Sequence, residues 1–269
     1  MPRQAEWNAE TYHVVSRPHE NWGAAVLARV PRSGITKAMD AGCGTGKITR
    51  ALLELLPDAS VTAVDYSQAM LDVARREYQP IYGERVSFLQ VDLSQAQASD
   101  FPDRYDLIFS TATFHWIHDH ERLFRLLFDL LAPGGWLVAQ CGGGPNLNRA
   151  RAFASGLMQS ERFARWFGDW QEPWYYADDV VTAERLRSAG FEAIETNLEE
   201  QPTEMHDAET YREYVRTVIF REHLAKIAAE GEKQAFVDAL VANASESDPP
   251  YLLDYWRLNM KARKPGTGG

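Results

Sequence analysis

Apolar runs alternate with helical patterns through the first half of the chain. Short runs rich in Val, Ile, Leu, Ala and Phe are followed by segments whose apolar residues recur every three or four positions. This alternation predicts βαβ units and a parallel sheet. The predicted strands are residues 37–41, 61–65, 86–91, 107–110 and 136–141. The predicted helices are residues 48–56, ended by Pro57, and residues 68–77.

The second half is less regular. A helix-prone block follows residues 142–145, and it is rich in aromatic side chains: Phe153, Phe163, Trp166, Phe167, Trp170, Trp174, Tyr175 and Tyr176. A sixth strand is predicted at residues 191–199, after the turn Ala189-Gly190. A long helical block follows at about 208–244. Residues 255–262 alternate by two between apolar and polar, which predicts a last strand.

The turn after the first predicted strand carries the strongest chemical signal. It reads Asp40-Ala41-Gly42-Cys43-Gly44-Thr45-Gly46, and its alternate glycines allow a sharp bend and a close approach to a ligand. The next strand ends in Asp65, at roughly the distance (about 20 residues) at which nucleotide-binding α/β folds present an acid to a ribose.

Two nucleotide-binding loops are excluded by spacing. A P-loop requires Gly-Lys-Ser/Thr, but Ile48 follows Gly46-Lys47, and Ala41 stands where the first glycine belongs. The dinucleotide fingerprint ends in Gly or Ala. Here Lys47 or Thr49 occupies that position, depending on the glycine from which the count starts. A nicotinamide dehydrogenase is therefore disfavoured.

The remaining pattern, Asp-x-Gly-x-Gly-x-Gly, resembles the class I S-adenosylmethionine-dependent methyltransferases. Further segments resemble the family in the same order along the chain: Val64-Asp65-Tyr66-Ser67 with Met70, Val91-Asp92-Leu93, residues 105–110 and residues 131–137. The resemblance implies a doubly wound, mostly parallel seven-stranded Rossmann-like sheet. Its last strand would lie antiparallel between strands five and six.

The resemblance also implies an organisation around one methyltransferase domain. The expected parts are a helical cap (1–35), a cofactor-binding core (36–141), helical lid insertions (145–185 and 203–250) and a last strand (251–264).

By resemblance, Asp65 binds the ribose hydroxyls of S-adenosylmethionine, Asp92 the adenine amino group and Gly42 the amino-acid tail. The alternative for Asp65 is an acid that caps the next helix. The other residues expected to contact the cofactor are Asp40, Gly44, Tyr66, Met70, Leu93 and Ser110.

The substrate side is expected after the fourth strand, where His115 and Trp116 follow the carboxyl end. His115 is the candidate catalytic residue, either as an orienting donor for a carboxylate or as a general base for a hydroxyl. The alternative is that His115 only caps the loop and Trp116 packs in the core. His118 and His120 are expected at the surface.

A narrower resemblance is carried by Trp7–Tyr12, Phe114–Ile117 and Asp254–Asn259. These segments resemble the trans-aconitate 2-methyltransferase-like branch, whose named member esterifies a carboxylate of a small polyacid. Tyr12 and Trp22 are accordingly expected to bind substrate together with Trp116. A polyacid should require buried arginines, and the candidates are Arg149, Arg151, Arg216, Arg221 and Arg257. The many lid aromatics suit a more apolar substrate equally well.

Charge, hydropathy and cysteine content narrow the possible partners and location of the protein. The net charge of −10 over 269 residues, with no long basic run, argues against nucleic acid as a partner. No apolar stretch approaches the 18 or more residues of a membrane span. Cys43 and Cys141 fit a reducing cytoplasm without metal-ligand spacing. Cys43 reads as a small residue filling the glycine loop, or else as a reactive thiol. A monomer or a homodimer is expected.

The leading hypothesis is a methyltransferase that acts on a small molecule, at a carboxylate or other oxygen, by in-line displacement. The first alternative is a catalytically silent member that binds the cofactor as a sensor or partner protein. If the protein is an enzyme, the methyl acceptor could also be a phenol, a carbon acid or a carrier-bound acyl chain. A carrier would require a basic docking face near the lid, and the sequence reveals none.

Overall fold

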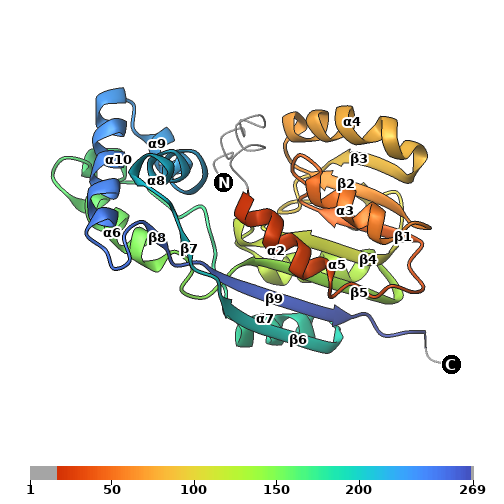
Figure 1. The fold of residues 1–269 in the computed structure, drawn as a ribbon. Coiled ribbons are helices and arrows are strands. Elements are labelled where there is room, and N and C mark those ends of the chain that lie inside the picture. Colours follow the sequence, from red (N-terminus) through yellow and green to blue (C-terminus); the bar gives the residue numbers. More distant parts are fainter. Residues whose placement is uncertain (1–16, 268–269) are drawn as a thin grey trace. The chain divides into compact units, whose positions relative to one another are not determined.

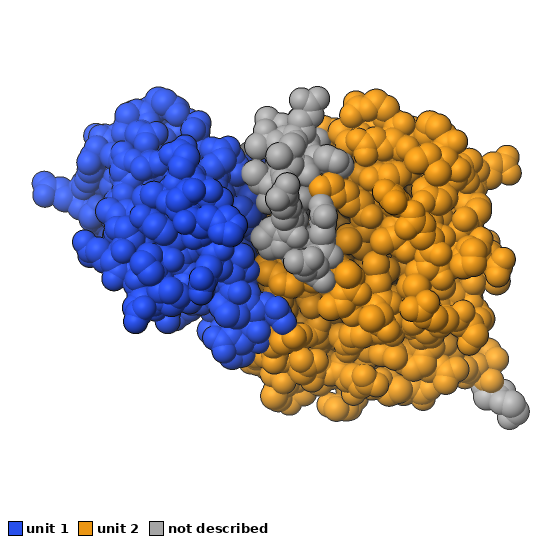
Figure 2. Space-filling view, in the orientation of Figure 1, with its two compact units in different colours: residues 1–6, 145–173, 200–256 blue, residues 7–144, 174–199, 257–269 orange. Residues whose placement is uncertain are grey.

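The computed structural model describes residues 17–267, and these form two compact units (Figure 2). Within the described residues, unit 2 comprises 17–144, 174–199 and 257–267, and unit 1 comprises 145–173 and 200–256. The boundary at residue 173 assigns 174–185 to unit 2, although we expected them in the first lid insertion. None of the described helices is long and apolar enough to span a membrane.

Unit 2 is built on a seven-stranded sheet with the order β3-β2-β1-β4-β5-β9-β6 (Figure 1). Its strands are β1 (Lys37–Ala41), β2 (Ser60–Asp65), β3 (Val86–Gln90), β4 (Tyr105–Thr111), β5 (Leu131–Gly142), β6 (Glu192–Glu200) and β9 (Trp256–Arg263). The first five strands pair in parallel, and β9 pairs antiparallel with β5. The predicted doubly wound sheet is confirmed, including the position of its last strand between the fifth and sixth.

Helices cover both faces of this sheet. Helices α2 (Arg17–Leu27) and α3 (Lys47–Leu55) pack on one face, where Val26 and Leu52 join an apolar cluster with β2, β4 and β5. On the other face α5 (His120–Leu130) and α7 (Asp179–Ser188) pack on a cluster that includes alternate residues of β9. Helix α4 (Gln68–Tyr82) packs against β2 and β3. The central strands are buried on both faces, which is why they read as continuous apolar runs.

Two elements are longer than predicted. Helix α4 continues to Tyr82 with Pro80 inside it, although we expected an end at residue 77. Strand β5 begins at Leu131 rather than at 136, because its pairing with β4 shifts register between Tyr105 and Leu107 and so accommodates the Pro-Gly-Gly segment. Short 3₁₀ turns complete the unit: η1 (Gly83–Arg85), η2 (Ala98–Asp100) and η3 (Phe114–Trp116).

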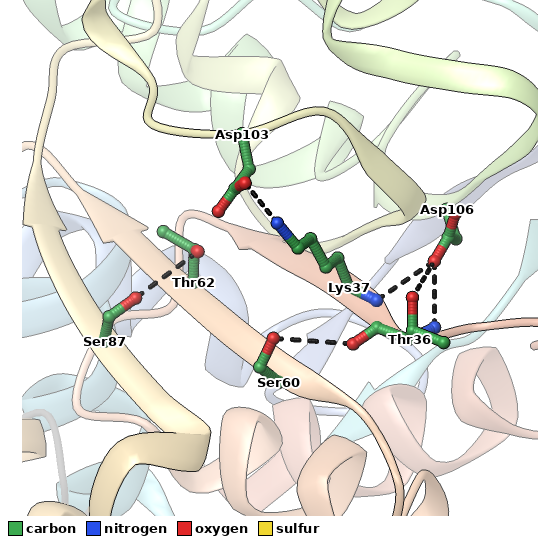
Figure 3. A network of polar contacts seen from close by, with 7 residues as sticks. All are labelled: Thr36, Lys37, Ser60, Thr62, Ser87, Asp103 and Asp106. Atoms are coloured by element: carbon green, nitrogen blue, oxygen red, sulfur yellow. Dashed lines mark hydrogen bonds and ion pairs between the residues drawn. The ribbon is translucent and has the colours of Figure 1, made fainter.

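A polar network fixes the amino ends of the central strands (Figure 3). The carboxylate of Asp106 accepts hydrogen bonds from the backbone N–H of Thr36 at 2.9 Å and from its hydroxyl at 2.8 Å. It also accepts one from the N–H of Lys37, whose ammonium pairs with Asp103. These contacts set the register of β1 against β4 at the edge opposite the glycine loop.

Unit 1 is helical around an aromatic core. Its elements are α6 (Asn148–Gln159), η4 (Ala164–Trp166), β7 (Thr203–Glu204), α8 (Ala208–Tyr214), the π-helix η5 (Val215–Ile219), α9 (Arg221–Lys226), α10 (Glu230–Ser245) and β8 (Leu252–Leu253). The rings of Phe163, Phe167 and Phe220 each lie 5.2–6.4 Å from that of Phe236. The helical block predicted at 208–244 thus consists of α8 and α9, which η5 joins, and of α10 after a short loop.

Candidate functional site

The glycine loop is held by the end of β2. The N–H groups of Gly42 and Cys43 both donate to the Val64 carbonyl, at 2.7 and 2.9 Å. The N–H of Gly44 donates to Oδ2 of Asp65 at 2.9 Å. Loop and acid are thus one hydrogen-bonded unit, formed where β1 and β2 end side by side.

Asp65 is not the cap of the following helix. Ser67 caps α4 by accepting the Met70 N–H, while Oδ1 of Asp65 accepts the Ser67 N–H at 2.9 Å. Backbone N–H groups of Ser67, Gly44 and Tyr66 all bond to this carboxylate. Burial raises the pKa of Asp65, and these N–H donors partly oppose the rise. A carboxylate oriented in this way at the strand end suits the hydroxyls of a ribose.

Asp40 lies at the end of β1 and is 1% exposed. The Thr49 hydroxyl donates to its Oδ2 at 2.6 Å, whereas no donor among the described residues reaches its buried Oδ1. Burial raises the pKa of Asp40 to about 7, with a further contribution from the charge of Asp65. A buried acceptor without a donor is costly, so the site favours a ligand that brings an N–H group or a cation.

The loop leaves room for such a ligand at Gly44. Its φ is +54°, and a Cβ built on it would meet no atom within 4 Å. The unsatisfied Oδ1 of Asp40, the oriented carboxylate of Asp65 and this open backbone fit the ammonium and ribose groups of S-adenosylmethionine. These residues would hold the cofactor. Their contacts with it remain predictions.

Gly42 performs a different task. A Cβ on it would lie 2.0 Å from the Thr113 hydroxyl oxygen, so only glycine permits this approach. Thr113 Oγ1 donates to the carbonyls of Thr111 at 2.9 Å and of Gly42 at 3.3 Å. The Ser110 hydroxyl, fully buried, donates to the Ala41 carbonyl at 2.6 Å. Thr113 and Ser110 therefore tie the exit of β4 to the cofactor loop. Cofactor contact by Ser110 stays a prediction.

The segment after β3 carries two further cofactor candidates, Asp92 and Leu93. Asp92 is exposed, and its Oδ1 accepts the Ser94 N–H at 2.9 Å. Leu93 is buried in the core, so its side chain points away from solvent. Arg122 of α5 donates to the carbonyls of Leu93, Ser94 and Ala96. This guanidinium, which sequence reasoning missed, fixes the loop that presents Asp92.

On α4 and before it, Met70 is buried and Tyr66 is half-buried, next to Asp65. Both remain predicted cofactor contacts.

Cys43 and Cys141 are buried free thiols. Burial raises the pKa of Cys43 well above its ordinary value and that of Cys141 to about 12, so both stay protonated. Cys43 is accordingly the small filler of the loop.

His115 lies in the turn η3 and is 9% exposed. Its Nδ1 accepts the backbone N–H of Gly142, at the end of β5, at 3.3 Å. An imidazole nitrogen that accepts cannot carry a proton, so the neutral ring holds its proton on Nε2. His115 is therefore oriented by the sheet as an Nε2–H donor.

Aromatic rings surround this histidine. Trp116 lies 5.4 Å from the imidazole centroid and Tyr176 lies 5.7 Å from it. Trp174 stacks on Tyr176 at 6.0 Å with 12° between planes, and also contacts Trp116. The Tyr175 N–H donates to the His115 carbonyl at 2.8 Å. We predicted residues 174–176 within a helix-prone block, but this segment is non-helical. The alternation of Trp174 and Tyr176 is the sequence signal that could have indicated an extended segment.

His120 does not lie on the surface, contrary to our prediction. It is 1% exposed, and its Nε2 lies 3.0 Å from the Phe114 carbonyl. A carbonyl only accepts, so Nε2 carries the proton. Burial lowers the pKa of His120 to about 4 and keeps the ring neutral. His120 thus fastens the turn that carries His115, whereas His118 is exposed as expected.

Of the five candidate arginines, Arg257 is the one that is buried, at 2% exposure. It pairs with Gly142 across β9 and β5, and its Nε donates to Oε1 of Gln140 at 3.3 Å. Its guanidinium lies 4.3 Å from the ring centroid of Trp22. A buried cation thus stands beside the strand end that holds His115. Substrate binding by Trp22 stays a prediction, and Tyr12 lies outside the described residues.

Comparison with known proteins gives the following relatives. A family model described as a methyltransferase domain matches residues 38–135. Trans-aconitate 2-methyltransferase of Methylobacterium radiotolerans is 30% identical over 97% of this chain and 99% of its own. The protein of the same name from Paracidovorax citrulli is 36% identical over half of each chain.

Solved structures show the same fold. A methyltransferase structure from Bacillus halodurans aligns with a TM-score of 0.60 at 18% identity, over 90% of this chain and 98% of its own. Phosphoethanolamine N-methyltransferase 2 of Haemonchus contortus, bound to phosphomonomethylethanolamine and S-adenosylhomocysteine, aligns with a TM-score of 0.56 at 22% identity. That alignment covers 91% of this chain and 52% of the other.

We predict that Asp65→Ala weakens S-adenosylmethionine binding about 100-fold or more, because it removes a charged acceptor from two hydrogen bonds of about 1.5–3 kcal/mol each. Calorimetric titration of the folded variant measures the affinity. Asp72→Ala, which removes an exposed acid from α4, is the matched control and should bind normally. An unchanged affinity in Asp65→Ala contradicts the ribose assignment.

A second prediction concerns the buried proton of Asp40. Because its pKa rises from 3.8 to about 7 on folding, the folded state holds a proton that the unfolded chain has released, and stability falls as pH rises between these values. Relative to Asp40→Asn, which does not titrate, the cofactor-free protein should lose roughly 2 kcal/mol between pH 5 and pH 8. Denaturant unfolding of both proteins checks this, and parallel pH profiles would refute it.

Proposed function

The chain belongs to the class I S-adenosylmethionine-dependent methyltransferases, in their trans-aconitate 2-methyltransferase-like branch, and from this membership we propose that it methylates a carboxylate oxygen of a small molecule. Its cofactor is S-adenosylmethionine. When bound, the cofactor supplies a methyl group activated by a sulfonium. The chain's own residues then have to bind the acceptor, orient it and exclude water.

The observation that carries the proposal is the hydrogen bond from the Gly142 N–H to Nδ1 of His115. It leaves the proton on Nε2, where a neutral histidine can donate but cannot accept. If Nδ1 of His115 carried a proton, its N–H would point at the N–H of Gly142, and the two donors would repel each other at an N–N distance of 3.3 Å. His115 is therefore suited to orienting an acceptor that is already ionised.

A carboxylate is such an acceptor. With an ordinary pKa near 4, it is ionised at neutral pH and needs no general base. A phenol, with a pKa of about 10, would need one. Of the two roles left open by the sequence, the donor role agrees with the geometry of His115.

Two further features support an acidic, planar substrate. Arg257 places a buried positive charge beside the strand that carries Gly142, which favours an anionic group nearby. Trp116, Trp174 and Tyr176 offer flat walls beside the imidazole. A small unsaturated polyacid, the kind of substrate named for the relatives, combines both properties. Its identity, the oligomeric state and a cytoplasmic location are proposals that rest on the sequence.

The direct test is a screen for release of S-adenosylhomocysteine with small carboxylic acids, phenols and amines as acceptors. We expect turnover with unsaturated di- and tricarboxylic acids, trans-aconitate first, and a methyl ester as product by mass spectrometry. Turnover confined to phenols or amines would overturn carboxylate methylation. Tight cofactor binding without turnover on any acceptor would favour the silent, sensor-like alternative.

We predict that His115→Gln keeps kcat within about tenfold of the wild type, because the amide can accept from Gly142 and donate to the acceptor. His115→Ala should lower kcat about 100-fold, the usual cost of losing an aligned donor. His118→Ala, at an exposed position, is the control. Equal losses in Gln and Ala would establish a general base instead, because glutamine can donate a hydrogen bond but cannot take up a proton.

A further inference from the structure

Unit 1 contains an open pocket of about 330 Å³ beside the π-helix η5, with α9 and α10 around it. Its lining residues all come from these elements or their ends: Arg216, Arg221, Leu224, Ala225, Glu230, Lys233, Gln234 and Val237. Asp65, His115 and Arg257, on which the proposed methyl transfer depends, belong to unit 2, and none of them lines this pocket. Arg216 and Arg221 were candidates for binding a polyacid by sequence, but both belong to unit 1.

The lining is predominantly cationic. Three positive side chains, Arg216, Arg221 and Lys233, face the pocket together with one acid, Glu230. The chain as a whole carries a charge of −10, so a cationic cluster runs against its general composition. A local excess of positive charge attracts anions to a pocket, in particular where part of the wall is apolar.

Two of the cations have acidic partners, and one has none among the described residues. Arg221 pairs with Glu222 at 2.6 Å, and Lys233 pairs with Glu230 at 3.0 Å. No carboxylate of the described chain lies within 4 Å of the Arg216 guanidinium, which is exposed. The residues that line the pocket therefore carry a net positive charge, and the ammonium of Lys233 has three N–H donors, more than its ion pair with Glu230 uses.

The π-helix explains how the two arginines reach one pocket. The N–H of Phe220 bonds to the Val215 carbonyl at 2.7 Å, five residues back. In an α-helix residues four apart share a face, whereas this wider turn brings residues five apart to the same face. Arg216 and Arg221 have that spacing. Such π-turns are frequent at functional sites.

The rest of the lining is apolar or neutral. Leu224 and Val237 are buried, and Ala225 and Gln234 complete the wall. The volume lies at the lower end of the range for small-molecule sites. Guanidinium groups match carboxylate and phosphate oxygens in a bidentate fashion, and an ammonium adds a point charge.

We propose that this pocket binds a small organic anion with at least two negative charges, carried by phosphate or carboxylate groups on a short apolar frame. Arg216 is its principal anchor, Lys233 contributes further donors, and Arg221 adds positive charge to the wall. The site stands independently of the methyl acceptor proposed above. An anion bound there stabilises the folded arrangement of η5, α9 and α10 by mass action.

Calorimetric titration of the full chain tests the proposal with two probes, pyrophosphate and citrate, at constant ionic strength, with sodium chloride as the reference. We expect saturable binding of at least one probe with a Kd of about 1 mM or tighter. Preference for pyrophosphate assigns phosphate chemistry, and preference for citrate assigns carboxylate chemistry. Binding should persist in His115→Ala, which separates this pocket from the methyl-transfer site.

Two variants locate the site. Arg216→Gln and, independently, Lys233→Gln should each weaken binding about tenfold, while Arg165→Gln, which removes an exposed cation elsewhere in unit 1, leaves it unchanged. If Arg216→Gln does not fold, Lys233→Gln carries the test alone. Heat no greater than that of sodium chloride overturns the proposal, as does equal affinity in wild type and both pocket variants. If His115→Ala loses citrate binding whereas both pocket variants keep it, citrate binds at the methyl-transfer site. That outcome also overturns the proposal.

Discussion

The contact between Gly42 and Thr113 is the constraint on which the candidate site depends. Thr113 fills the space that a side chain at position 42 would need, and its hydroxyl bonds back to the Gly42 carbonyl. Because His115 follows two residues later, the loop that fits the cofactor and the turn that carries the donor are fixed to each other. A larger residue at position 42 would displace both at once. Methyl transfer depends on the relative placement of two bound groups, so this one close approach serves the whole reaction.

The strands and the cofactor loop could largely be predicted from the sequence, because the patterns that indicate them lie within short segments. The buried parallel strands read as apolar runs, and the alternation in residues 255–262 identified β9. The spacing of the glycines with Asp65 identified the cofactor loop, and the structure adds that Asp65 also fastens that loop through Gly44. The family resemblance then placed β9 between β5 and β6. Composition alone would not have done so, since sheet order depends on pairings far apart in sequence.

The features that escaped prediction are those in which a side chain acts on distant backbone. His120 follows two exposed residues and reads as polar surface, yet it is buried because it donates to the Phe114 carbonyl. Arg122 looks like an ordinary helix residue, but it bonds to three carbonyls of the segment after Asp92. The π-turn at residues 215–219 interrupts an unbroken helical pattern and brings Arg216 and Arg221 to one pocket. Each depends on tertiary partners, which periodicity does not encode.

The position of β9 has a consequence for the order in which the molecule folds. Strand β5 (131–142) has β9 (256–263) as its antiparallel neighbour. Residues 143–255 separate the two strands in the sequence. During synthesis the nascent sheet therefore presents the open edge of β5 until β9 has left the ribosome. Such long-range closure is slow and leaves an unpaired edge accessible to other chains. Pairing with β9 closes that edge, and Lys261 and Arg263 of β9 lie over the Trp136 ring of β5 and add cation–π contacts to the pairing.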